Sequence, residues 1–158
     1  GLPSQVMAKL TSRSFRQALE SRAPSWLVSF GNWLFGGLVT DSVLKEIVHD
    51  HTLLTPAVIE RSNQNRRRPG IIKPIMAVRN ALPSWETDFA PHLSSITHPT
   101  MIIWGEHDRV FPLAVGEELH DRIRGSTFVR IPKAGHMPQW ERPDLVNRSV
   151  IAYIQPLP

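Results

Sequence analysis

The sequence has 158 residues, enough for one ordinary domain, and its 41% hydrophobic and 20% charged residues are typical of a globular chain rather than a disordered one. It contains no cysteine, which excludes a disulfide framework and a thiolate metal site. The formal charge is +4, a mild excess of basic residues that are scattered apart from Arg66–Arg68, so nucleic-acid binding receives little support.

The start of the sequence and its longest apolar stretch are the features that indicate where in the cell the protein is located. The sequence begins at Gly1 without an initiator Met, so we expect that the natural start of the gene is not shown. Its first residues lack the charged and apolar segments of a signal peptide. The apolar stretch over 26–39 is interrupted by polar residues and glycines, and it is shorter than the ~20 residues that span a bilayer. These features predict a cytoplasmic protein with no membrane partner.

The first 85 residues predict helices and no strand. Ser25 is placed to cap the second helix, and Gly36 and Gly37 are expected to end it. Thr55 followed by Pro56 is a typical N-cap and first-turn signature for the fourth helix. The five expected helices cover about 4–20, 26–35, a third from 40 or 41 onward, 56–68 and 71–81.

The pattern changes after Trp85. The run over 100–104 is continuously apolar, as a strand buried on both faces should be, and 127–131 predicts a second strand. A proline opens each of the helices expected over 113–123 and 144–154. This strand-helix-strand-helix order predicts a right-handed parallel unit.

The helical pattern before Trp85 and the strand-helix pattern after it predict two structural parts. We expect a helical subdomain over 1–87, followed over 88–158 by part of a doubly wound core. The fold class is therefore α/β, with a β-α-β-α segment of a parallel sheet.

Asp108 and His136 are the residues best placed for chemistry. Each follows the carboxyl end of a predicted strand, and in parallel sheets this edge is where ligands bind. If the strands are neighbours, the carboxylate of Asp108 can accept from one nitrogen of His136, which leaves the other nitrogen to act as a general base. A surface role for each residue alone stays open. Nothing in the chain reads Gly-x-Ser-x-Gly, so a serine nucleophile is not visible.

Two segments resemble a known family. Residues 102–112, Ile-Ile-Trp-Gly-Glu-His-Asp-Arg-Val-Phe-Pro, resemble the segment that carries the triad acid in the α/β-hydrolase superfamily. Residues 134–143, Ala-Gly-His-Met-Pro-Gln-Trp-Glu-Arg-Pro, resemble its histidine loop, and the match spans roughly 95–155. The resemblance implies that Asp108 orients His136, and that residues 1–85 form the helical cap of a partial α/β-hydrolase fold. It also implies that the first six strands, the oxyanion-hole loop and the nucleophile belong to an N-terminal half, which is the expected partner.

Within the superfamily, the pattern His-x-x-Gln-Trp-Glu is similar to the histidine loop of meta-cleavage-product hydrolases, which cut carbon–carbon bonds. Esterases, epoxide hydrolases and haloperoxidase-like enzymes share much of the same signature. The nucleophile, Ser in some of these subfamilies and Asp in others, lies outside the chain. The resemblance implies a hydrolase of an ester or C–C bond in a small apolar substrate, with no cofactor or metal, and inactive as this chain alone.

Several side chains are candidates for substrate binding. Trp140 is either a pocket residue beside His136 or an aromatic anchor of the last helix. Phe30 and Trp33 form either the roof of an apolar pocket or a helix surface packed on its neighbours. Arg67, within the basic run, can pair with a substrate carboxylate or lie solvated at a helix end. Val110 in the acid segment completes the candidates.

Other classes of function remain open. A non-enzymatic binding module would use the apolar groove of the cap and would not depend on Asp108 or His136. A nucleic-acid binder would use Arg66–Arg68 and would bind in a salt-dependent way. A homo-oligomer is left open. His49, His51 and His92 are expected at the surface, His107 is expected to point away from Asp108, and no pair of these histidines has metal-ligand spacing with an acidic partner.

Overall fold

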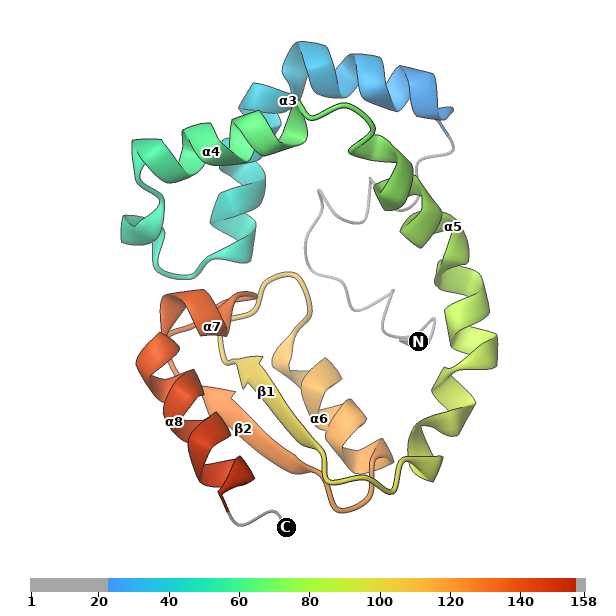
Figure 1. Ribbon diagram of the computed structural model, residues 1–158, viewed down its shortest axis with the longest axis vertical. Coiled ribbons are helices and arrows are strands. Elements are labelled where there is room, and N and C mark those ends of the chain that lie inside the picture. The colour runs from blue at the N-terminus through green and yellow to red at the C-terminus, as the bar shows by residue number, and fades with distance from the viewer. Residues whose placement is uncertain (1–22, 156–158) are drawn as a thin grey trace.

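The computed structural model describes residues 23–155, so the helix expected over 4–20 lies outside the described residues. Figure 1 shows a helical part followed by a small sheet with a helix on either face. The helical part contains α3 (Ser25–Ile47), η1 (His51–Leu53), α4 (Pro56–Arg66), α5 (Ile72–Asp88) and η2 (Ala90–Ser95). The predicted α/β class with a helical part first is confirmed. The domain boundary near residue 87 stays a prediction.

The first described helix, α3, corrects the expected pair of short helices. It runs through Gly36 and Gly37 without ending, and its two halves are bent by 82° relative to each other. A Cβ on Gly36 would lie 2.8 Å from Cζ of Arg66, whose guanidinium donates to the carbonyl of Asn32 (2.5 Å). The glycines therefore let the last residue of α4 pack closely on α3, rather than ending the helix.

The apolar side chains of α3 are largely exposed. Trp26, Phe30 and Trp33 are 69%, 54% and 70% exposed. In the described part of the chain, no single helix is both long and apolar enough to cross a membrane, and the two arms of α3 pass only as a bent pair. The helical part thus presents an apolar surface that the described residues do not cover.

The boundaries of α4 and α5 agree with the sequence in part. Thr55 caps α4 as predicted, because its hydroxyl accepts from the amide of Val58. The helix α5 continues to Asp88, beyond the predicted end at Ala81. In this extension the hydroxyls of Ser84 and Thr87 donate back to helical carbonyls (2.9 and 3.2 Å), which satisfies two residue types that otherwise disfavour helix interiors.

The sheet contains β1 (Met101–Gly105) and β2 (Thr127–Ile131), which lie close to the predicted strands. They pair in parallel, with Ile103 opposite Val129. The helices α6 (Leu113–Arg122) and α8 (Pro143–Ile154) also match expectation, whereas the short helix α7 (Pro138–Glu141) was not predicted.

The helices α6 and α8 cover opposite faces of the sheet (Figure 1). On one face, Ile131 packs with Val146 of α8 in the hydrophobic core. On the other, Trp104 lies against Gly116 of α6, where a Cβ would come within 2.6 Å of the indole. Most of β1 is nevertheless only half-buried, because two strands form a narrow sheet. This arrangement leaves the carboxyl ends of both strands at the same edge.

Candidate active site

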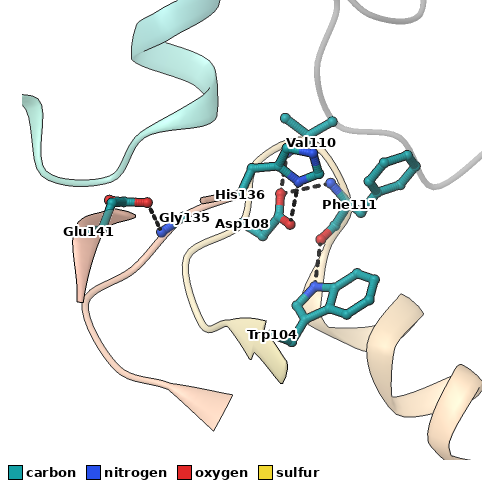
Figure 2. Close-up of polar contacts among 7 residues, drawn as sticks. All are labelled: Trp104, Asp108, Val110, Phe111, Gly135, His136 and Glu141. Carbon is teal, nitrogen blue, oxygen red and sulfur yellow. Dashed lines mark hydrogen bonds and ion pairs between the residues drawn. The ribbon is translucent and has the colours of Figure 1, made fainter. Parts of the chain in front are cut away.

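Asp108 lies in the turn that follows β1, and both oxygens of its carboxylate have partners. Oδ1 accepts from the backbone amides of Val110 (2.8 Å) and Phe111 (2.9 Å), which fixes the side chain (Figure 2). Oδ2 faces the ring of His136. The indole of Trp104 donates to the carbonyl of Phe111 (3.0 Å) and so anchors this turn to the strand. The Asp108 side chain is 5% exposed, so its charge depends on these donors.

His136 lies beyond the end of β2, and the contact predicted with Asp108 is present. Nδ1 of His136 lies 2.9 Å from Oδ2 of Asp108. Since the carboxylate is an acceptor, the contact assigns the ring proton to Nδ1 and leaves Nε2 as the basic nitrogen. The ring of Phe111 lies 5.5 Å away between centroids, tilted by 46°. The imidazole is 33% exposed, which leaves it accessible to a reacting group.

Two glycines allow the strand ends to approach each other closely. A Cβ on Gly105 would overlap the carbonyl oxygens of Gly135 and Ala134. A Cβ on Gly135 would lie 2.7 Å from the carbonyl oxygen of Ile47, at the end of α3. The turn that carries Asp108, the histidine loop and the end of α3 therefore meet at one point.

Glu141 on α7 is a residue of the site that the sequence did not single out. Its Oε1 accepts from the amide of Gly135 (2.7 Å), immediately before His136. Its Oε2 accepts from the amides of His49 (2.7 Å) and Asp50 (3.0 Å). The only signal in the sequence was its place in the resembling loop, because its partners are backbone groups, two of them about 90 residues away in the chain.

The predicted substrate-binding residues lie in separate places. Trp33 and Arg67 line a pocket of about 350 Å³ between the first turns of α3 and the α4–α5 connection, and Phe30 is near Trp33, with ring centroids 6.2 Å apart. Trp140 is half-buried on α7. The Val110 side chain is fully buried, so the described contribution of this residue is its backbone amide. Neither Asp108 nor His136 lines the described pocket, so the structure does not bring the two groups together.

His49, which was expected at the surface, contacts His107, which was expected to point away from Asp108. The rings of His49 and His107 stack with centroids 4.1 Å apart and an interplanar angle of 16°. His107 lies in the turn after β1, directly before Asp108, and His49 lies just beyond α3. The pair is a second contact between the helical part and the loop that carries Asp108.

A family model described as the alpha/beta hydrolase fold matches residues 5–143. The chain is 34% identical over 108 residues to a 2-hydroxy-6-oxononadienedioate/2-hydroxy-6-oxononatrienedioate hydrolase of Klebsiella pneumoniae, covering 68% of this chain and 38% of the relative. It is 28% identical over 113 residues to an uncharacterized hydrolase of Bacillus subtilis, covering 71% of this chain and 40% of the relative. The chain therefore spans about two fifths of the length of these curated relatives.

Solved structures share the fold. A 2-hydroxy-6-oxo-6-phenylhexa-2,4-dienoate hydrolase from a Rhodococcus superposes with a TM-score of 0.65 at 16% identity, covering 86% of this chain and 50% of that one. An alpha/beta hydrolase from a Medee basin deep-sea metagenome library gives a TM-score of 0.66 at 20% identity, covering 91% of this chain and 52% of that one. At these identities the likeness concerns the fold alone.

Proposed function

Because this chain belongs to the α/β-hydrolase fold family, we propose that it supplies the acid and the histidine of a nucleophile–His–Asp triad to a hydrolase. The observation that carries the proposal is the 2.9 Å contact between Asp108 and His136 at the carboxyl ends of two adjacent parallel strands. The nucleophile belongs to the N-terminal half of the same fold, which is the proposed partner.

In this proposal His136 moves the proton and Asp108 holds the ring. Nε2 of His136 removes the proton from the attacking hydroxyl or water and later returns it to the leaving group. Asp108 stays ionised, keeps the proton of the resting ring on Nδ1, and stabilises the imidazolium that forms between the two steps. The backbone amides of Val110 and Phe111 keep the carboxylate in this orientation throughout.

The substrate class is proposed from two sources. The Klebsiella relative, named as a hydrolase of 2-hydroxy-6-oxo dienoates, supports C–C bond cleavage in a carboxylated chain. The acid–histidine pair formed by Asp108 and His136 is also the pair that Ser-His-Asp hydrolases of esters use. We therefore propose hydrolysis of an ester or C–C bond in a small, largely apolar substrate.

The test combines the chain with a supplied N-terminal half. The segment of the Klebsiella relative that precedes the matched region is co-expressed with this chain, and p-nitrophenyl esters and 2-hydroxy-6-oxo-6-phenylhexa-2,4-dienoate are offered. Turnover is expected only in the combination, and Asp108→Asn should lower kcat by about 10⁴-fold. His136→Ala should abolish it, whereas the exposed His98→Ala should not. Turnover by the chain alone that is lost in His136→Ala would contradict the proposed inactivity of the chain.

The pocket on the helical part favours a second candidate function, the binding of an anionic aromatic ligand without catalysis. Trp26 and Trp33 are among its lining residues, together with Arg67, Arg68 and Lys73. None of the described residues that line this pocket is an Asp or a Glu, so the charged side chains among them are all basic. A ligand that joins a carboxylate to a ring would suit both kinds of side chain.

This candidate is tested by titrating the chain with benzoate and following tryptophan fluorescence. Arg67→Gln is expected to weaken binding about tenfold through loss of one charge-assisted contact, whereas Arg148→Gln on α8 should not. Asp108→Asn and His136→Ala should leave binding unchanged. A response that does not saturate, or one that Arg148→Gln weakens equally, would dismiss the candidate.

A further inference from the structure

Glu141 carries a buried charge that the proposed triad chemistry does not use. The residue is 7% exposed, and in the described part of the chain no Lys or Arg forms an ion pair with it. A buried carboxylate is costly unless donors surround it. Here the donors are backbone amides instead of a cationic side chain. The positions of these amides in the chain therefore indicate which segments the carboxylate connects.

The amides come from two segments that are distant in sequence. Gly135, the donor to Oε1, is the residue before His136. His49 and Asp50, the donors to Oε2, follow the end of α3 and lie 92 and 91 residues away from Glu141. One carboxylate therefore joins the histidine loop to the segment that follows α3.

A direct backbone contact lies beside this carboxylate. The amide of His136 donates to the carbonyl of Ile47 (2.8 Å), at the last residue of α3. A Cβ on Gly135 would lie 2.9 Å from the amide nitrogen of His49, so the two segments approach without room for a side chain. The backbone of His136 is thus set by the end of α3 on one side and by Glu141 on the other.

We propose that Glu141 is a positioning residue that fixes the histidine loop and the end of α3 as one unit, and thereby keeps the ring of His136 on Asp108. The donors require a carboxylate, because an acceptor-only group is needed where three N–H groups converge. In Glu141→Gln, an amide NH₂ faces at least one of these donors. The inference rests on the proposed function of His136, but its test needs neither a substrate nor a nucleophile.

The first test is NMR on the chain itself. The ¹⁵N shifts of the His136 ring report which nitrogen carries the proton, and the unaltered chain is expected to show Nδ1–H with an unprotonated Nε2. Glu141→Gln should give a mixture of both tautomers and about tenfold or faster amide exchange at Gly135, His49 and Asp50. Glu117→Gln, an exposed change of the same chemistry on α6, should leave both readouts unchanged. Unchanged exchange at the β1 and β2 amides that pair the two strands verifies that each variant is folded.

A second pair of variants decides the question if Glu141→Gln does not fold. Asp50→Ala removes the side chain but keeps the amide that donates to Glu141, whereas Asp50→Pro removes both, at a φ of −87° that is near the proline range. The tautomer mixture is expected in Asp50→Pro and not in Asp50→Ala. A His136 ring that is identical in both variants and in Glu141→Gln would overturn the proposal. Failure of the hydrolysis assay with a sensitive ring tautomer would refute the proposed function alone.

Discussion

Gly105 is the residue on which the approach of the two loops depends most directly. In Gly105→Ala the new Cβ meets the backbone carbonyls of Ala134 and Gly135, which cannot move without displacing the histidine loop. We expect the free energy of unfolding to fall by about 1–3 kcal/mol, as in other overpacked sites, measured by urea titration. Gly31→Ala is the control, because a Cβ there has nothing within 4 Å and should stabilise α3 by about 0.5–1 kcal/mol. Equal effects at the two positions would contradict this account.

The stability of the η1 turn, which follows α3, is expected to depend on pH through Asp50. The hydroxyl and the amide of Thr52 donate to its carboxylate, and they hold the pKa of Asp50 below the ordinary value of 3.8. A carboxyl group with a lowered pKa in the folded state contributes stability above the unfolded pKa, and this contribution is lost as pH falls through the folded pKa. We therefore expect the η1 turn to loosen below pH 3.8, followed through the carboxyl ¹³C shift of Asp50 and the amide of Thr52. Titration at or above 3.8 would contradict the prediction, and Asp50→Asn should remove the pH dependence.

The sequence predicts some contacts of the candidate site well and others not at all. The contact between Asp108 and His136 could be predicted because each residue follows a strand, and the carboxyl ends of parallel strands share an edge. Glu141 could not, because a carboxylate that accepts only from backbone amides leaves no pattern of paired side chains. Arg67 and Trp33 were expected near the substrate, but their place relative to His136 depends on the path of α3, which the sequence does not specify.

At the scale of elements, Arg66 holds α4 against α3. Its Nη1 donates to the carbonyl of Asn32, its Nε donates to Asn63 (3.1 Å), and its own carbonyl accepts from the Asn32 amide (3.1 Å). Arg66→Ala is expected to lower the free energy of unfolding by about 1–3 kcal/mol in urea titration, because hydrogen bonds to a charged group are lost. Arg68→Ala, which lines the pocket but has no such contact in the described chain, should change it by less than about 0.5 kcal/mol. An equally large loss of unfolding free energy in Arg68→Ala would show that the positive charge, rather than the contacts of Arg66, stabilises the helical part.

The elements that could be predicted are those whose signals are local. The strand over 127–131 was predicted residue for residue, because its apolar residues and the turn at Gly125 lie within a few positions. The course of α3 was not, since Gly36 and Gly37 usually end a helix and only the distant Arg66 explains their presence inside one. The contact of Gly36 and Gly37 with Arg66 therefore had more effect on the course of α3 than the local tendency of glycine to end a helix.

At the scale of the whole molecule, the exposed surface and the narrow sheet agree with a chain that spans about two fifths of its relatives. Phe30 and Trp33 on α3 remain exposed, and over the described residues 23–155 the sheet has two strands with an unpaired edge on each. Unpaired strand edges and large apolar surfaces favour association. An N-terminal half that supplies neighbouring strands would cover one such edge.

This leads to a prediction about β1 that does not depend on catalysis. The amides of β1 that face away from β2 have no partner strand in the described sheet, so they should exchange rapidly with solvent in the chain alone. When the N-terminal segment of the Klebsiella relative is added, a new strand beside β1 should slow their exchange at least about tenfold, measured by NMR or mass spectrometry. His136→Ala should give the same protection, because pairing of the strand edge does not use the imidazole. Protection confined to α3, with the β1 amides unchanged, would mean that the two segments meet through the apolar helical surface and that the sheet is not extended.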